Sequence, residues 1–517
     1  MINPGIGGCQ MELEPAEKRR ETEIILGYND FPMWLDIKRL GKETVIYGIG
    51  TIVSRYLNFL LVPFYSNVLS LKEYGILTNI YSYIALFYVI YYCGLDAAYM
   101  KYASSKELGN EKQAFSAAHF MVYFLAILFS FVFFLFRNFL ARQFLLDEHQ
   151  ARIIYYVMGI LFFDSISVIP FASLRFHSRP LKFAVFKALN VIFNLTLNIL
   201  LVWRFKLGIE GVFLAGLGAS FLTWLILLPD ILRQLAARLH RKLWTSLLKF
   251  GLPFVPTRFS LAIMQVIDRP ILLALAGVTT AGIYEANYKL GTSLLVLVSI
   301  FQLAWQPFVL KNADRPDAKI LFGKVFTLLL MVGSTLLLIL SLFMENLAKM
   351  SLFGIHLLGQ NYWRGLEIVP VILCASLFYA FFFNFSAGLW IEKKTHILPF
   401  LTGTGAAVNI FLNLLLIPKY EILGAAWATL VSYMLMDIGA IYFSQRVYRI
   451  QYEYKKIARI GFGILASLGG YFLVKRLIPV NEILLKSISV SVYLVLLFSW
   501  NFLDFKSVCR ALSGQQG

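Results

Sequence analysis

Long apolar segments are the feature that most constrains how this 517-residue chain can fold. A helix that spans a bilayer needs about 20 consecutive apolar residues. Fourteen segments meet this requirement, although the fourth contains Asp164 and the seventh contains Arg258, Asp268 and Arg269. The segments are 43–69, 74–100, 114–136, 152–176, 182–204, 208–232, 247–277, 281–310, 319–343, 365–390, 396–417, 422–445, 457–478 and 482–504. The sequence therefore predicts an all-α polytopic membrane protein with about fourteen transmembrane helices.

The composition supports a chain that is solvated mainly by lipid. Hydrophobic residues make up 59% of the sequence and charged residues 15%, whereas roughly a quarter of the residues in soluble domains are charged. The net charge of +18 does not indicate nucleic-acid binding, because the basic residues form short runs between apolar segments. By the positive-inside rule, such runs mark cytoplasmic connections.

The distribution of Lys and Arg predicts the orientation of the helices. The connections on one side carry more than twice as many basic residues as those on the other, and that side includes both termini. The first 35 or so residues are polar and mixed, so we expect a cytoplasmic tail and not a cleavable signal peptide. The sequence thus predicts that both termini are cytoplasmic.

Signatures of catalysis and metal binding are missing from the sequence. It has no GxxxxGK[ST] loop for ATP hydrolysis and no HExxH motif, and its six histidines are isolated. The four cysteines occur singly, which supports neither a zinc site nor a disulfide framework. The connections between the apolar segments are short, which leaves no room for an extramembrane catalytic domain. We therefore expect no enzymatic activity, no cofactor and no metal.

An internal repeat divides the first twelve segments. Asn194-x3-Asn198 recurs as Asn409-x3-Asn413, displaced by 215 positions, and both motifs precede a small-residue helix that contains Gly211 or Gly424. Pro63 and Gly75 recur as Pro270 and Gly282, both displaced by 207 positions. Parallel repeats of six helices are one known plan for transporters, although small residues and asparagines also recur simply because they pack helices.

The repeat predicts four parts of the chain. These are a cytoplasmic tail (1–40), an N-terminal six-helix bundle (41–242), a C-terminal six-helix bundle (243–450), and two additional helices with a short tail (451–517).

Several short motifs, taken in order, resemble those of a known family. They are Leu60-Leu-Val-Pro63-Phe-Tyr, Glu73-Tyr-Gly75, Gly94-Leu-Asp96, Lys249-Phe-Gly-Leu-Pro253, Ala281-Gly-Ile-Tyr284, Tyr288-Lys289-Leu290, Asn409-x3-Asn413-x4-Pro418 and Gly424-Ala-Ala426. Together they resemble the polysaccharide and O-antigen flippases of the multidrug/oligosaccharidyl-lipid/polysaccharide exporter superfamily, over about residues 40–505. The resemblance implies a V-shaped pair of bundles around a central cavity in a bacterial inner membrane. It also implies transfer of a polyprenyl-pyrophosphate-linked oligosaccharide to the outer leaflet, with a polysaccharide polymerase and glycosyltransferases as pathway partners.

Two arginines in the apolar segments are candidates for binding the anionic headgroup. Arg55 lies eight positions before Pro63, and Arg258 lies twelve positions before the matching Pro270. The difference is one helical turn, so both could lie on equivalent faces. Permanently charged guanidinium groups suit a diphosphate. Alternatively, Arg55 pairs with a nearby acid or extends to the interface.

Four acids are candidates for ion coupling because a buried carboxylate titrates readily, and each has an alternative role. They are Asp96, Asp164, Asp268 and Glu285. Asp96 could cap a short connection, and Asp268 could form an ion pair with Arg269 at a helix end. Glu285 lies four residues before Lys289, an order that favours a salt bridge, although both could line the cavity.

Polar side chains on two of the matching helices could also line the cavity. The candidates are Asn194, Asn198, Asn409, Asn413 and Lys289. For the asparagines, hydrogen bonds between helices, worth about 1 kcal/mol each, are the alternative.

The predicted function is flipping of a lipid-linked oligosaccharide by alternating access, with the prenyl tail remaining in lipid. An acid-lined pocket would instead favour a multidrug-extrusion antiporter for small cations. A glycan polymerase or ligase would need a long extracytoplasmic loop, and the sequence has no such loop.

Overall fold

The computed structural model describes residues 61–105, 109–147, 150–236, 241–352, 355–477 and 481–500, most of which are helical. The first part of the chain forms α3 (Leu61–Val68), α4 (Leu71–Tyr92), α5 (Leu95–Ser105), α6 (Glu111–Leu135), α7 (Arg137–Gln143), α8 (Ile153–Ile166), α9 (Val168–Phe176), α10 (Pro180–Asn198), the π-helix η2 (Ile199–Arg204), α11 (Gly208–Gln234) and α12 (Arg241–Gly251). The next part forms α13 (Phe254–Val266), α14 (Asp268–Ala276), α15 (Val278–Gly291), the 3-10 turn η3 (Thr292–Leu294), α16 (Leu295–Asn312), α17 (Ala318–Lys349), the 3-10 helix η4 (Gln360–Ile368), α18 (Val369–Phe385), α19 (Ala387–Ile391) and α20 (Ile397–Val447). Two strands, β1 (Ser351–Leu352) and β2 (Ile355–His356), form a short antiparallel hairpin, and the chain continues with α21 (Tyr454–Leu477) and α22 (Glu482–Ser499).

Local sequence signals set the ends of several helices. Ser70 caps α4: its hydroxyl accepts a hydrogen bond from the Glu73 backbone N–H at 3.2 Å, and the Glu73 carboxylate accepts one from the Ser70 N–H at 3.0 Å. Asn110 and Gln113 form the same reciprocal capping box at the start of α6. Such boxes satisfy backbone donors that the first helical turn leaves unpaired.

Eleven helices of the described residues are long and apolar enough to cross a membrane, which confirms the all-α polytopic class. Three differences separate this count from the fourteen predicted segments. The first segment lies mostly outside the described residues. The segment 281–310 is broken by η3 and is not among the eleven, and α20 is counted once although it contains two of the predicted segments.

The 51-residue helix α20 is a pair of antiparallel helices. Its backbone leaves the helical region at Glu421 (φ 45°, ψ −120°). A methyl group placed on Gly439 would lie 2.6 Å from the Leu401 side chain, and one on Gly405 would lie 3.6 Å from the Met436 side chain. Residues at both ends of α20 are therefore side by side, so the chain reverses direction near Glu421.

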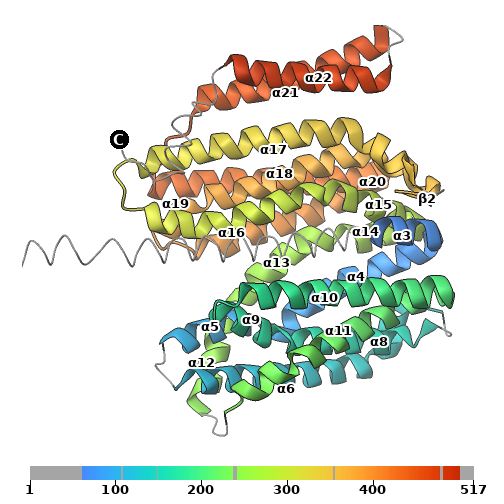
Figure 1. Cartoon of the computed structure of the whole chain (residues 1–517), viewed down its shortest axis with the longest axis vertical. Helices are drawn as coiled ribbons and strands as arrows, with labels where there is room; N and C mark the ends of the chain where they lie inside the picture. Colours follow the sequence, from blue (N-terminus) through green and yellow to red (C-terminus); the bar gives the residue numbers. More distant parts are fainter. Residues whose placement is uncertain are drawn as a thin grey trace, which may run out of the picture.

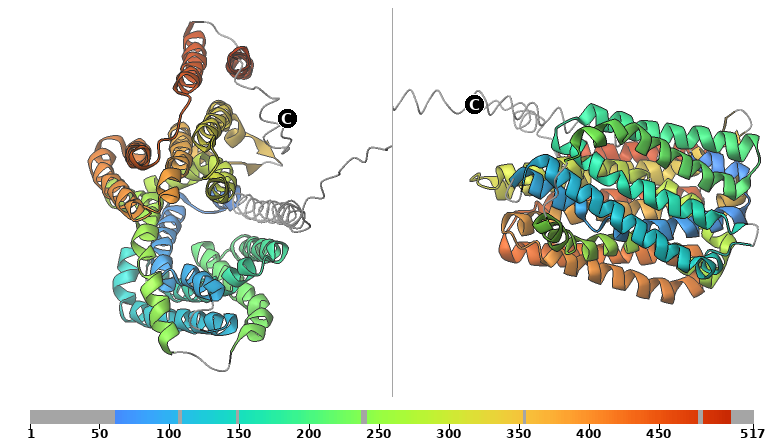
Figure 2. Two further views of the ribbon diagram at one scale, coloured as in Figure 1. Left: turned by 90° about the vertical axis from the view of Figure 1, so that its left-hand side faces the viewer. Right: turned by 90° about the horizontal axis from the view of Figure 1, so that it is seen from below.

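The described helices run roughly parallel and form two groups with a hairpin on one side (Figures 1 and 2). Helices α4–α12 occupy the lower half of Figure 1, α15–α20 the upper half, and α13 and α14 lie between them. The α21–α22 hairpin lies along the top of Figure 1 and packs on α17, where the Ser334 and Tyr493 hydroxyls are 2.6 Å apart.

The linker helix α12 packs with the first group of helices. Its Leu243 and Leu247 side chains are buried, and it contacts α5 and α6. The predicted bundle boundary at residue 242 would assign most of α12 to the second bundle. The four-part division of the chain remains a prediction.

The repeated motifs adopt matching local geometry. The Asn198 side-chain amide donates to the Asn194 carbonyl and side-chain oxygens, at 2.8 and 2.9 Å. Asn413 donates in the same way to Asn409, at 2.8 and 3.1 Å. The equivalent glycines Gly75 and Gly282 meet each other, since a methyl group on Gly282 would lie 2.9 Å from the Gly75 nitrogen. These contacts are those expected if a pseudo-two-fold axis passes between α4 and α15.

Candidate functional site

Helices α4 and α15 approach each other closely at one end of the seam between the two groups. A methyl group on Gly75 would overlap the Val278 carbonyl oxygen, and one on Gly282 would lie 2.7 Å from the Leu71 carbonyl oxygen. At the same end, α3, which the hydrogen bond from Tyr65 to Asn198 ties to α10 of the first group, contacts β2, which lies between α17 and η4 of the second. There the Asn67 side-chain amide donates to the His356 carbonyl oxygen at 2.8 Å. The two groups are thus joined at this end of the seam.

The opposite end of the seam is also joined, by α4, α5 and α12 of the first group on one side and by α13, which packs on α20, on the other. Gly94, with φ of 67°, turns the chain from α4 to α5, and a methyl group there would lie 2.6 Å from the Gly251 carbonyl oxygen. Arg258 makes two hydrogen bonds to the Asp96 carboxylate, at 2.7 and 3.2 Å, and donates to the Tyr92 hydroxyl at 3.0 Å. The Arg175 guanidinium lies 3.9 Å from the same carboxylate.

A cluster of four charged side chains lies between these two ends; we call Asp268, Arg269, Glu285 and Lys289 the charged cluster. Arg269 lies 2.6 Å from the Asp268 carboxylate and donates to the Glu285 carboxylate at 2.9 Å. Lys289 reaches the other Glu285 oxygen at 3.6 Å. Both ion pairs that the sequence suggested, Asp268–Arg269 and Glu285–Lys289, are therefore present, and Arg269 joins them.

Burial makes the members of the charged cluster depend on one another. Asp268 and Arg269 are 1% and 4% exposed. The Tyr284 hydroxyl donates to Asp268 at 2.5 Å, and the Arg269 guanidinium lies 4.0 Å from the centre of the Tyr288 ring. Removing one partner from a buried ion pair typically costs about 3–5 kcal/mol. Lys289 differs from the rest, because 36% of its side chain is exposed.

Two cavities meet at the charged cluster. The polar cavity has a volume of about 270 Å³ and lies among α13, α14, α15, α18 and α20. The apolar cavity has a volume of about 970 Å³ and lies among α3, α4, α10, α15, α16 and α17. The two linings share Glu285, Lys289, Thr292 and Leu295, so Lys289 is accessible to a ligand in either space.

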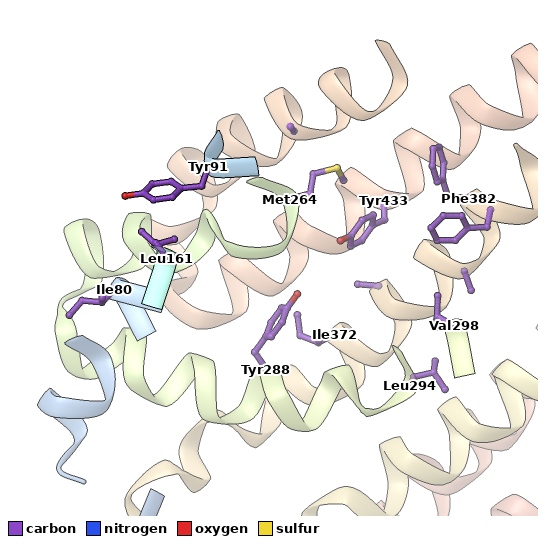
Figure 3. Packing of buried hydrophobic residues seen from close by; sticks show 14 of the residues in the cluster. Ile80, Tyr91, Leu161, Met264, Tyr288, Leu294, Val298, Ile372, Phe382 and Tyr433 are labelled. Atoms are coloured by element: carbon purple, nitrogen blue, oxygen red, sulfur yellow. The ribbon is translucent and has the colours of Figure 1, made fainter. Parts of the chain in front are cut away.

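Hydroxyl-bearing and amide side chains give the polar cavity its character. Tyr288 and Tyr433 contribute to its wall, and their hydroxyl groups point toward one another beside Ile372 (Figure 3). The Tyr379 ring lies beside that of Tyr433, with ring centres 5.3 Å apart and planes tilted by 47°. Gln265, Ser376 and Thr429 complete this polar lining.

The predicted asparagines divide between the cavity and the helix interior. Asn194 lines the apolar cavity together with Asn190. Asn198 is fully buried and accepts a hydrogen bond from the Tyr65 hydroxyl at 2.9 Å. Asn409 and Asn413 are also buried, and neither contributes to the described linings of the two cavities. Their position within α20 suits the helix-packing alternative.

The remaining predicted site residues lie elsewhere. Arg55 lies outside the described residues. Arg258 and Asp96, predicted for two different roles, bind each other at one end of the seam. Asp164 on α8 interacts with the Ser220 side chain and with Lys187. Their roles in binding the headgroup or coupling ions stay predictions.

Sequence reasoning missed the central position of Arg269 and the tyrosines of the polar cavity. Arg269 was expected to pair locally with Asp268, but it also bridges to a residue on the next helix. The sequence signal for this bridge was the presence of Glu285 and Lys289, sixteen and twenty positions after Arg269. The tyrosines carried no distinguishing signal, because aromatic residues are abundant throughout this chain. Among the described residues, no group of three His, Cys, Asp or Glu side chains is arranged to hold a metal.

Comparisons with known proteins identify both sequence and fold relatives. A family model for "polysaccharide biosynthesis protein" matches residues 40–313, just over half of the chain. An uncharacterized membrane protein of Methanocaldococcus jannaschii is 21% identical over 416 residues, which cover 76% of this chain and 95% of that protein.

Solved structures show the same fold at low sequence identity. The lipid II flippase MurJ in an inward closed conformation has a TM-score of 0.72 and 14% identity, covering 88% of this chain and 99% of the flippase chain. A multidrug resistance MATE family transporter of the MOP superfamily, in an inward-facing conformation, has a TM-score of 0.63 and 13% identity, with coverage of 76% and 94%. A MOP superfamily transporter from Pyrococcus furiosus has a TM-score of 0.60 and 12% identity, with coverage of 79% and 95%.

Proposed function

The chain belongs to the polysaccharide biosynthesis protein family, and from this premise we propose that it flips a polyprenyl-pyrophosphate-linked oligosaccharide across the membrane by alternating access. Its fold is that of MOP superfamily transporters. The proposed pathway produces a surface polysaccharide such as O-antigen, capsule or exopolysaccharide. A polymerase and glycosyltransferases of that pathway are proposed partners.

The charge of the cavity walls is the observation that carries the choice of substrate. Asp268 and Glu285 balance Arg269 and Lys289 in the charged cluster, but the two bases differ in exposure: Arg269 is buried against its partners, whereas 36% of the Lys289 side chain is exposed to the cavities. An accessible ammonium group suits a phosphate-bearing substrate, because charge-assisted hydrogen bonds to phosphate are strong. A multidrug-extrusion antiporter for small cations, the alternative, would be favoured by an acidic lining.

The contacts at the two ends of the seam support alternating access. Asn67 and His356 join the groups at one end, and Asp96 and Arg258 join them at the other. Opening one set of contacts while the other stays closed would expose the cavities to one side of the membrane at a time. We propose that the Asp96 end faces the cytoplasm of a bacterial inner membrane, with both termini on that side.

Deletion of the gene tests the proposed function. We expect a lipid-linked saccharide to accumulate in the cytoplasmic leaflet of the deletion strain, because its route to the outer leaflet would be lost. Lipid extraction and mass spectrometry would identify the saccharide. Normal saccharide levels together with a loss of resistance to cationic drugs would instead support the antiporter.

A lysine substitution in the same strain tests the site. Lys289→Gln removes an accessible positive charge where the two cavities meet, whereas Lys455→Gln removes an exposed lysine at the start of α21. A charged hydrogen bond is worth about 1.5–3 kcal/mol, so we expect Lys289→Gln to lower the rate of flipping by roughly 10- to 100-fold. The control should remain near the wild-type rate at equal membrane abundance. Equal rates in both variants would exclude Lys289 from the site.

A further inference from the structure

The apolar cavity has a wall that the glycan and its phosphates do not require. Four side chains of α17 line this cavity at spacings of four, four and three residues: Leu336, Leu340, Met344 and Leu347. These spacings place them on one helical face. At 1.5 Å per residue, the stripe is about 16 Å long. Leu61, Leu77 and Leu297 contribute to other walls from α3, α4 and α16.

Two exposed residues of α17 precede this stripe in the same helical row. Leu328 and Val332 are 40% and 38% exposed and do not line the cavity. Met344 is 5% exposed and Leu336 and Leu340 are half-buried, whereas Leu347 at the end of the stripe is 40% exposed. The spacing of four residues from Leu328 to Met344 therefore gives α17 one apolar row that is exposed in its first part and lines the cavity in its second part.

The apolar cavity has polar side chains at one end, where it adjoins the polar cavity. Lys289 and Glu285 belong to both linings, and Asn190 and Asn194 face the apolar cavity from α10. A ligand that fills the apolar cavity and reaches Lys289 must carry an apolar chain at one end and an anionic group at the other.

We propose that the apolar cavity binds the part of the substrate's hydrocarbon chain nearest the diphosphate. In this arrangement the diphosphate lies at Lys289, the chain extends along the α17 stripe, and the remainder of the chain leaves for the bilayer. The proposal rests on the proposed function and changes one expectation of it, namely that the whole tail stays in lipid. Moving a chain from lipid into an apolar cavity replaces one apolar environment with another. The cavity therefore orients the chain and contributes little affinity inside a bilayer.

Water-soluble probes make the contribution of the apolar cavity to binding measurable, because their hydrocarbon chains move into the cavity from water and not from lipid. We would compare inorganic pyrophosphate with geranyl diphosphate, which adds a ten-carbon isoprenoid chain, in binding assays on the full chain purified in detergent. Chain burial from water is favourable by the hydrophobic effect. Wild-type protein should therefore bind geranyl diphosphate at least about tenfold more tightly than pyrophosphate.

Matched pairs of tryptophan substitutions show where the hydrocarbon chain of the probe binds. Leu336→Trp with Leu340→Trp fills part of the cavity, whereas Leu328→Trp with Val332→Trp adds the same bulk to the exposed part of the row, outside the described cavity lining. We expect the first pair to reduce the advantage of geranyl diphosphate to less than about threefold, while its affinity for pyrophosphate is unchanged. The control pair should keep the full advantage. Unchanged pyrophosphate affinity also shows that each variant is folded.

The outcomes separate this proposal from the function on which it rests. If pyrophosphate binds and geranyl diphosphate binds no more tightly, the hydrocarbon chain does not enter the apolar cavity, although the anion site is supported. If both tryptophan pairs lose the tighter binding of geranyl diphosphate equally, the hydrocarbon chain binds elsewhere and the proposal is wrong. If neither probe binds wild-type protein, the anion site itself fails, and the proposed function loses its main support.

Discussion

Two arginines of this membrane protein form ion pairs with acids on other helices. Arg258 pairs with Asp96, which lies 162 positions earlier in the chain. Arg269 pairs with its neighbour Asp268 and with Glu285 on the next helix. Ionisable groups within membrane segments are costly when unpaired, so each pair stabilises one arrangement of the helices that carry it.

A charge swap tests whether Arg258 acts by pairing with Asp96. Arg258→Asp places two carboxylates together and leaves the Tyr92 hydroxyl without its donor. We expect a loss of about 1–3 kcal/mol in stability. Adding Asp96→Arg restores opposite charges but places a second guanidinium group beside Arg175, so the Tm of the double variant in detergent should return part of the way to the wild-type value. A double variant as unstable as Arg258→Asp would contradict the pairing.

The same swap also tests the predicted role of Arg258 in binding the headgroup. If the guanidinium contacts the diphosphate from α13, moving it to position 96 should leave flipping impaired even though stability partly returns. Flipping at the wild-type rate in the double variant would show that Arg258 serves only to pair with Asp96.

At the scale of elements, contact between α4 and α15 depends on two small residues. Gly75 and Gly282 allow the two backbones to meet at one end of the seam. Glycines at helix interfaces in membranes commonly serve this purpose, because close approach increases van der Waals contact. In this chain the two glycines are also equivalent positions of the repeat.

Gly75→Ala tests this packing against a matched alanine substitution. The added methyl would overlap the Val278 carbonyl oxygen, so α4 and α15 would have to separate. We expect a loss of about 1–3 kcal/mol, typical of overpacking. Gly461→Ala on α21 meets no atom within 4 Å and should be neutral or stabilise the helix by up to about 1 kcal/mol. Thermal unfolding of both variants in detergent would measure the difference, and equal Tm values would rule out a close-packed crossing at Gly75.

At the scale of the whole molecule, the two groups of helices enclose the apolar cavity between them and touch at both ends of the seam. The contact between α3 and β2 involves Asn67 and His356. Alternating access requires such contacts to open during each cycle. Preventing that opening should stop transport without affecting the site itself.

A reversible crosslink tests this requirement. In a background without Cys9, Cys93, Cys374 and Cys509, we would introduce Asn67→Cys with His356→Cys and add a short, thiol-cleavable bismaleimide analogue. We expect flipping in proteoliposomes to fall at least tenfold and to recover after reduction, because the linker holds the two groups together. Crosslinking Lys349→Cys to His356→Cys joins residues on the same side of the seam and should have little effect. Undiminished flipping in a fully crosslinked Asn67–His356 protein would argue against movement at this contact.

Local sequence determined the class of this protein, most of its membrane segments and its repeat. Transfer of a helix into lipid depends mainly on the apolar content of that helix, so segments such as 114–136 and 319–343 could be located without any tertiary information. Pairs within one helix were also accessible, because i,i+4 spacing alone places Glu285 beside Lys289 and Asn194 beside Asn198. The ends of broken or reversed helices, as in α20 and α15–α16, were less well predicted.

Only the tertiary structure decided which residues from different helices meet. Sequence could not show that Asp96 pairs with Arg258, because their contact depends on how helices distant in the chain are packed. It could not distinguish the tyrosines of the polar cavity from those facing lipid, since both environments accept the same side chain. The two cavities, and Lys289 where they meet, exist because several helices leave space between them. That space is a property of the packing, and no single segment of sequence contains it.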